Sequence, residues 1–130
     1  MTEPQETLRS FLRDKAVAFA EANLRLAPVH RKYFGEPLLE RAGDFLLHDT
    51  VHEVFEEVVE SGGAATIITR EHFKTADLRM RYHLTAVGEA WKIVRIDREC
   101  LCCRTKGLLE GVTCPVCEGE GWYDPRKDKD

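Results

Sequence analysis

The chain has 130 residues, of which 43% are hydrophobic and 32% are charged, and its formal net charge is −4. These totals predict a folded chain with a sizeable core, and the acidic charge argues against non-specific binding to nucleic acid or to anionic membranes. The sequence has no run of eighteen apolar residues, so it contains no segment that could span a bilayer as a helix. The N-terminal stretch MTEPQETLRSFLRDK lacks the apolar segment of a signal peptide, so we expect a cytoplasmic protein.

The first third of the chain predicts three helices. Apolar residues recur at helical spacing after Pro4, which fits a first helical turn, and the pattern extends to about Leu24. Pro28 cannot continue this helix but can begin a second, short one. Pro37 can begin a third short helix in the stretch PLLERAG.

The spacing of the apolar residues then changes from helical to alternating. In LRMRYHLTA, residues 78–86, apolar and polar positions alternate strictly, which predicts a strand with one buried and one wet face. A turn at Gly88 and the stretch AWKIVRID complete a hairpin, and AATIITR, which follows the turn SGG, is another strand. Residues 51–60, VHEVFEEVVE, fit a helix or a strand; their β-branched residues and the turn that follows favour a strand paired with AATIITR.

Helices that come first and antiparallel strands that follow them predict an α+β fold. We expect a helix-and-sheet domain over residues 1–98, a cysteine-rich ribbon over residues 99–123 and a disordered tail, DPRKDKD, over residues 124–130. Trp122 and Tyr123 are expected to dock the ribbon on the main domain.

All five cysteines lie in the stretch CLCCRTKGLLEGVTCPVCEGEGW. Cys100 and Cys103 form one C-x-x-C pair, and Cys114 and Cys117 form a second pair ten residues later. Two such turns that face each other place four thiolates in a tetrahedron, so the spacing predicts one structural Zn²⁺. The alternatives are two disulfides or free thiols. Disulfides are the weaker interpretation in a reducing cytosol. Cys102 is left over; it could replace a neighbouring cysteine as a ligand, but we expect it to point away from the metal.

The second cysteine pair, in CPVCEGEG, resembles the C-x-x-C-x-G-x-G unit of the DnaJ chaperone zinc domain over eight residues. The first pair, in CLCCRTKG, resembles it less closely, because Thr105 stands where the first glycine would be. The resemblance covers residues 100–121 and implies a structural zinc ribbon. It does not imply chaperone activity, since the chain has no J-domain with a His-Pro-Asp tripeptide.

A long helix, short helices and a sheet that closes with GEAWKIVRID resemble the nuclear transport factor two family over residues 1–98. The closing hairpin of that family often carries Gly-x-Trp-x-Ile; here Gly88, Trp91 and Ile93 follow this pattern with one extra residue before the tryptophan. The resemblance implies a cone in which the helices pack on a bent sheet around a pocket. Members include enzymes, transport and scaffold proteins, and toxin-immunity proteins, so the fold does not fix the function.

Five residues are candidates for lining such a pocket: Tyr33, Asp44, His48, Tyr82 and Trp91. No catalytic motif of the family aligns with them, so no catalytic residue is assigned. Large apolar side chains from the helices and the sheet would fill a cone of this size at normal packing density. We therefore expect a small or mostly closed pocket.

Four basic residues share the polar face of the predicted hairpin: Arg79, Arg81, His83 and Lys92. Four glutamates of the neighbouring stretch are expected to balance them across the sheet: Glu53, Glu56, Glu57 and Glu60. We expect this face to contact a protein partner or a second copy of the chain, and not nucleic acid. The predicted function is a non-enzymatic binding or scaffold protein, for instance an immunity-like one, with a structural zinc site. The alternative is an isomerase, dehydratase or hydrolase that uses the cone pocket.

Overall fold

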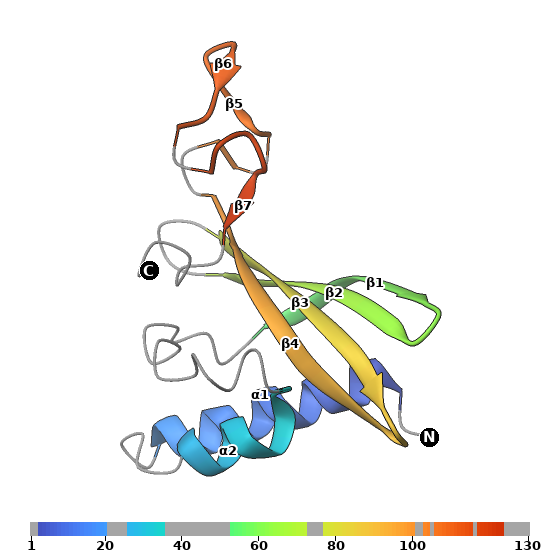
Figure 1. Ribbon diagram of the computed structural model, residues 1–130. Helices are drawn as coiled ribbons and strands as arrows, with labels where there is room; N and C mark the ends of the chain where they lie inside the picture. The colour runs from blue at the N-terminus through green and yellow to red at the C-terminus, as the bar shows by residue number, and fades with distance from the viewer. Residues whose placement is uncertain are drawn as a thin grey trace.

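The computed structural model describes residues 3–20, 26–35, 53–72, 77–100, 103–104, 106–115 and 117–123. Two helices come first, α1 (Pro4–Ala20) and α2 (Leu26–Tyr33). The longer strands follow them: β1 (Val54–Ser61), β2 (Ala64–His72), β3 (Asp77–Val87) and β4 (Ala90–Glu99). The short strands come last: β5 (Leu108–Leu109), β6 (Val112–Thr113) and β7 (Trp122–Tyr123). The predicted α+β class is confirmed (Figure 1).

The two described helices begin at prolines or close to them. α1 begins at Pro4, as predicted, and the Glu3 carbonyl accepts hydrogen bonds from the N–H groups of the next turn. α2 begins at Leu26, so the start predicted at Pro28 is wrong by two residues. Proline is tolerated there because the N–H groups of the first helical turn have no partner within the helix. Residues 21–25 and the third helix predicted from Pro37 lie outside the described residues. Neither described helix is long and apolar enough to cross a membrane.

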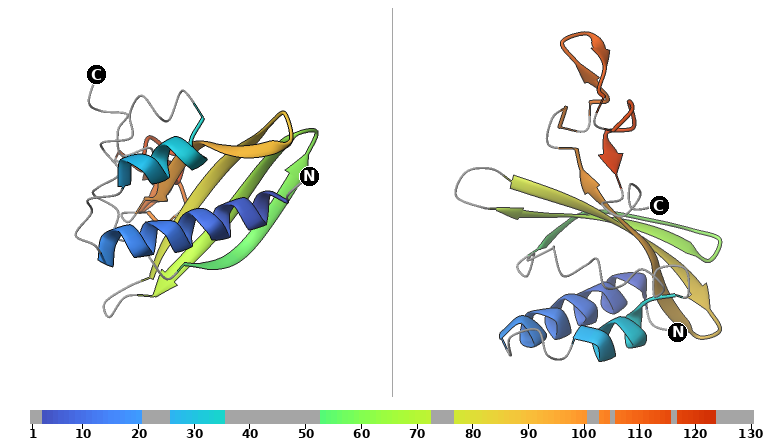
Figure 2. Two further views of the ribbon diagram at one scale, coloured as in Figure 1. Left: turned by 90° about the horizontal axis from the view of Figure 1, so that it is seen from below. Right: turned by 60° about the vertical axis from the view of Figure 1, so that its left-hand side comes forward.

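The strands form one antiparallel sheet in the order β1-β2-β3-β4-β7, and β5 and β6 form a separate small hairpin. The strand predicted for residues 51–60 is confirmed by β1, in which Val58 lies opposite Ile67 of β2. The predicted turns are confirmed as well, since Gly62, Gly63 and Gly88 all have positive φ. Both helices lie against the same face of the twisted sheet, which we call the inner face (Figure 2).

The core lies between this inner face and the helices. The alternation predicted for β3 is confirmed: Met80, Tyr82 and Leu84 point inward and are buried, and the residues between them face outward. The buried apolar cluster joins both helices to β2, β3 and β4, and its members are Leu8, Phe11, Leu12, Tyr33, Phe34, Ala65, Ile67, Met80, Tyr82, Leu84, Trp91, Ile93 and Ile96. Burial of side chains of this size stabilises the domain by about 1.5–3 kcal/mol each.

The end of α2 is attached to the edge of β4. Phe34 forms an isolated parallel bridge with Ile93, and the N–H of Gly35 donates to the Ile93 carbonyl at 2.8 Å. A Cβ atom at Gly35 would lie 2.8 Å from Cγ1 of Val94, so this close approach requires glycine.

Candidate metal centre

The four cysteines of the two C-x-x-C pairs meet in one cluster just beyond the end of β4. All four side chains are buried, and their sulfur atoms lie within 4.8 Å of one another. Two contacts run between the pairs: Cys100 Sγ lies 3.7 Å from Cys114 Sγ, and Cys103 Sγ lies 3.6 Å from Cys117 Sγ. The sequence therefore predicted correctly which thiols come together.

These distances fit a shared metal ion better than disulfides. A disulfide would bring its two sulfurs to about 2.05 Å. A metal ion about 2.3 Å from each of four tetrahedral thiolates separates the sulfurs by about 3.8 Å, close to the contacts between the pairs. The cluster is thus compatible with a metal site that has four thiolate ligands.

The backbone around the cluster has an approximate two-fold repeat. The N–H of Gly107 donates to Cys103 Sγ at 3.3 Å, and its carbonyl accepts from the N–H of Cys114 at 2.9 Å. Gly121 repeats this arrangement, because its N–H donates to Cys117 Sγ at 3.1 Å and its carbonyl accepts from the N–H of Cys100 at 2.9 Å. Each glycine therefore ties one cysteine pair to the other, and N–H donors at sulfur stabilise thiolate ligands.

The two glycine turns approach each other closely. Gly107 has a φ of 75°, and a Cβ atom there would lie 2.4 Å from the carbonyl oxygen of Gly119. The residues that follow each cysteine pair, Arg104 and Glu118, also have positive φ, at 54° and 57°. This backbone explains why glycines follow both pairs at the spacing seen in the sequence.

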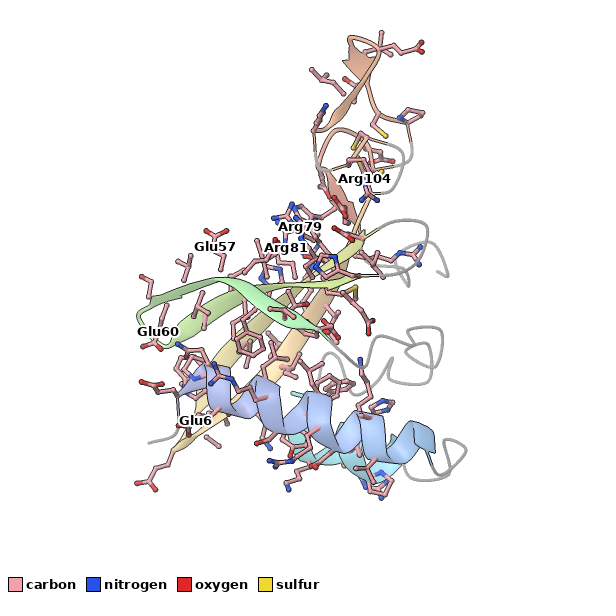
Figure 3. The ribbon with its side chains drawn as sticks, turned by 180° about the vertical axis from the view of Figure 1, so that it is seen from behind. Glu6, Glu57, Glu60, Arg79, Arg81 and Arg104 are labelled. Atoms are coloured by element: carbon pink, nitrogen blue, oxygen red, sulfur yellow. The ribbon has the colours of Figure 1, made fainter. Side chains whose placement is uncertain are left out.

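The cysteine module, residues 100–123, is attached to the main sheet by its last strand. In β7, Trp122 lies opposite Glu99 of β4, which is the residue before Cys100. The ring of Trp122 lies 5.4 Å from the guanidinium of Arg79 and 4.8 Å from that of Arg81, both on β3. The predicted docking role of Trp122 is confirmed. Figure 3 shows these arginines, together with Arg104, where the module meets the sheet.

The outer face of the sheet, opposite the helices, carries a network of ion pairs around Asp97. The unexposed carboxylate of Asp97 accepts from Arg81 at 2.9 Å, His83 at 2.8 Å and Arg95 at 2.7 Å. Burial alone would raise the pKa of Asp97, but these hydrogen bonds outweigh it and lower the pKa to about 2. Asp97 was not among the acids that the sequence placed on this face.

The glutamates that were predicted to balance the basic residues divide between the two faces. Glu56 is on the outer face and pairs with Arg79 at 2.8 Å and Arg70 at 2.6 Å, so this part is confirmed. The placement of Glu53 on the outer face is wrong. Its carboxylate is unexposed on the inner side, where it accepts hydrogen bonds from Thr69 and from Tyr82 at 2.6 Å, with the ammonium of Lys15 at 3.5 Å.

The predicted pocket residues that the structure describes are parts of the core. Tyr82 reaches Glu53, Trp91 is buried, and the Tyr33 hydroxyl donates to Asp14 at 2.5 Å. Burial raises the pKa of Tyr33, and the bond to Asp14 adds to this effect, to about 12. Asp44 and His48 lie outside the described residues.

A groove of about 490 Å³ lies between α1 and the start of β1. Its lining includes Arg9, Leu12, Glu53, Val54 and Phe55, and none of the three described pocket candidates, Tyr33, Tyr82 and Trp91. Nothing in the sequence indicates that Glu53 lies at a groove, because a glutamate before a strand is usually exposed.

Comparison with known proteins identifies no relative: no family model matches the chain, and neither a curated protein nor a solved structure matches it.

Proposed function

We propose that Cys100, Cys103, Cys114 and Cys117 bind one Zn²⁺ and that this zinc is structural. The observation that carries the proposal is the cluster of four buried sulfurs at 3.6–3.7 Å across the two pairs. Four protein ligands fill a tetrahedral zinc site, which leaves no position for water or a substrate. When bound, the ion supplies a fixed cross-link between the two turns and no reactive group.

Tetrahedral thiolate sites also suit iron, so the experiment has to tell the two metals apart. Protein purified without added metal should contain about one zinc per chain and show no visible absorbance from iron–thiolate bonds. Cys117→Ser should lower the zinc content sharply. Cys102→Ser is the matched control, because Cys102 belongs to neither C-x-x-C pair of the sequence, and its zinc content should equal that of the wild type.

We further propose that the chain is a non-enzymatic binding or scaffold protein of the nuclear transport factor two type, with a cone-shaped main domain. The packed core supports this proposal, because Tyr82 and Trp91, two candidates for a pocket, are buried among other core side chains. The outer sheet face supports it as well, since its many charged groups are arranged in an ordered network.

One observation favours the alternative of a small-molecule enzyme. Glu53 and Tyr82 form a carboxylate–tyrosine pair beside the groove at α1, and such pairs can transfer protons. However, the Glu53 carboxylate also accepts from Thr69 and pairs with Lys15, and its side chain is unexposed. The oxygens of this carboxylate are thus engaged by three side chains of the domain itself, which favours a structural role.

The variant Glu53→Gln distinguishes a structural role of Glu53 from a role in proton transfer. If Glu53 is structural, the variant lowers stability because the buried ammonium of Lys15 loses the carboxylate that lies 3.5 Å from it. If Glu53 transfers protons, the variant should keep its fold and bind a small carbonyl compound in the groove. A melting temperature equal to that of the wild type would contradict the structural role.

A further inference from the structure

Strand β1 lies at the edge of the sheet, with β2 as its only neighbour among the described strands (Figure 2). Proteins often protect such edges with very short strands, proline or lysine. β1 is eight residues long and contains neither proline nor lysine. Since alternate residues of an edge strand direct their N–H and C=O groups away from the sheet, β1 offers a row of backbone donors and acceptors to a further strand.

The side chains of β1 are exposed on both faces of the sheet. Seven of its eight residues are exposed, and Phe55 is the half-buried exception. Among the exposed residues are three valines: Val54, Val58 and Val59 are 61%, 36% and 52% exposed. Apolar side chains of this kind stabilise a sheet when the side chains of a neighbouring strand lie opposite them, so the edge is suited to a further strand.

Residues 57–60, Glu-Val-Val-Glu, place one glutamate and one valine on each face of this edge. The register with β2 puts Glu57 and Val59 on the outer face, and Val58 and Glu60 on the inner face. Figure 3 shows Glu57 on one side of β1 and Glu60 at its hairpin end. Neither carboxylate has an ion-pair partner in the part of the chain that the structure describes. We call residues 57–60 of β1 the acidic edge.

The cations closest to β1 lie at its other end. The guanidinium of Arg9 lies over the ring of Phe55 at 4.8 Å, and Arg70 pairs with Glu56 at 2.6 Å. A β-bulge before Glu57 separates this end from the acidic edge, and the pairing with β2 beyond the bulge is regular. A further strand therefore meets an undistorted and negatively charged stretch of β1.

We propose that the acidic edge binds an extended segment of another protein by strand addition, and that this segment has the pattern basic–apolar–apolar–basic. This inference rests on the proposed binding function and names a partner for it. Main-chain hydrogen bonds to β1 hold the segment, and directly opposed side chains select it. Because Glu-Val-Val-Glu reads the same in both directions, a parallel or an antiparallel segment sets lysine or arginine opposite each glutamate.

A second copy of the chain fits this edge poorly. In the antiparallel register that sets Val58 of each copy opposite Val59 of the other, Glu57 lies opposite Glu60. Like charges in directly opposed positions destabilise a pair of strands. β1 has three glutamates and no cation, so the same charges repel the phosphates of a nucleic acid. A basic segment is the occupant that the charges favour.

The test uses a labelled peptide with a Lys-Val-Val-Lys centre as the probe, and its fluorescence anisotropy is measured. The comparison is a peptide of the same composition with a Val-Lys-Lys-Val centre, which sets lysines opposite the valines of β1. The protein should bind the probe about tenfold more tightly than the comparison, with an affinity that falls as salt rises. No binding would overturn the inference, and so would equal affinity, which would mean that net charge alone attracts the peptides.

Methylation of backbone nitrogens in the probe tests strand addition itself. In an added strand, alternate N–H groups point towards β1 and the others point away from it. Methylation of one alternate set should abolish binding, whereas methylation of the other set should leave most of it. An equal effect of the two sets would contradict strand addition.

The double variant Glu57→Lys/Glu60→Lys tests the edge from the side of the protein. Both residues are exposed, so the variant should fold, as circular dichroism reports. It should bind the probe about tenfold more weakly and should gain binding of a Glu-Val-Val-Glu peptide, which the wild type should not bind. The matched control, Glu110→Lys/Glu120→Lys, makes the same change of charge at exposed residues of the cysteine module and should bind the probe as the wild type does.

Equal loss of binding in the control variant would overturn the inference. A dimer of the free protein that the probe dissociates would also overturn it, because the edge would then belong to a second copy. The zinc content of the same samples distinguishes the two proposals. Zinc-loaded protein that does not bind the probe contradicts the strand-addition inference alone, whereas folded protein without zinc contradicts the proposed zinc site.

Discussion

The main domain and the cysteine module are stabilised by different means. The main domain buries large apolar side chains from two helices and the sheet. In the described part of the module, the buried side chains are those of the four cysteines and Trp122, while Leu108 and Val112 are exposed on the small hairpin. The domain therefore depends on hydrophobic burial, and the module depends on its sulfur cluster and on backbone hydrogen bonds.

This difference teaches that the two regions should respond to different perturbations, although they share a boundary at β7. Loss of the metal should disorder the module and spare the domain. Loss of core packing should weaken the domain and leave the ligands of the metal in place.

The largest effect is expected from Cys117→Ser. Metal binding contributes on the order of 10 kcal/mol in small zinc sites, and the module has little apolar burial to replace it. We expect the module to lose its ordered structure while the helices and strands β1–β4 remain, as measured by backbone NMR and a thermal melt. Unfolding of the whole chain would show instead that the module is part of the domain's cooperative unit.

The converse perturbation is Leu84→Ala in the centre of the sheet. Leu84 is 1% exposed, and removal of such a side chain costs about 2–5 kcal/mol. The free energy of unfolding in urea should fall by this amount, with unchanged zinc content in the folded protein. Release of zinc under native conditions would contradict the separation of the two regions.

A smaller effect on stability is expected from a fall in pH, and it concerns the main domain alone. Burial, reinforced by the positive charge of Lys15, lowers the pKa of His30 to about 4 from an unfolded value of 6.5. Below pH 6.5 the unfolded chain binds a proton at His30 that the folded chain does not bind. The stability that depends on neutral His30 is therefore fully present above pH 6.5. It is lost as the pH falls towards 4, by about 2 kcal/mol at pH 5.

Urea unfolding at pH 7 and pH 5 measures this loss, and His30→Asn is the comparison. The variant keeps every other titratable group, so the contributions of those groups are the same in both proteins. The variant should lose about 2 kcal/mol less than the wild type between the two pH values. Equal losses would show that His30 accepts its proton in the folded state.

The smallest effect is expected from two glycine variants in the module. They separate the effect of a steric contact from the effect of the backbone conformation. Gly107 and Gly111 both have positive φ, at 75° and 85°, but only at Gly107 would a Cβ atom meet the backbone of Gly119. Gly107→Ala should therefore weaken zinc binding more than Gly111→Ala, by about 1 kcal/mol, because the backbone strain is common to both variants and only the contact differs. Competition with a chelator measures both affinities, and equal values would mean that the approach of the two turns is unimportant.

The sequence predicted the features that depend on local spacing. The alternation of β3 and the paired C-x-x-C turns are patterns of a few residues, and each agrees with the structure. The start of α2 was missed because proline fits equally well at several positions of a first helical turn.

The positions of Asp97 and Glu53 could not be predicted, because β-bulges change the face on which a residue lies. In β4 the pairing skips Val94, so Ile93 and Ile96 both face inward and Asp97 turns outward to Arg81. Strict alternation from Ile93 would have placed Asp97 in the core. A bulge in β1 between Phe55 and Glu57 has the same effect and separates Glu53 from Glu57, which strict alternation would place on one face.

Native mass spectrometry of protein purified without added metal tests the central claim most directly. The account predicts one zinc ion per chain, bound with the four cluster thiols deprotonated, and release of that zinc in acid without any disulfide in the denatured protein. A native mass without metal, or a denatured mass that shows disulfides between the cluster cysteines, would contradict it.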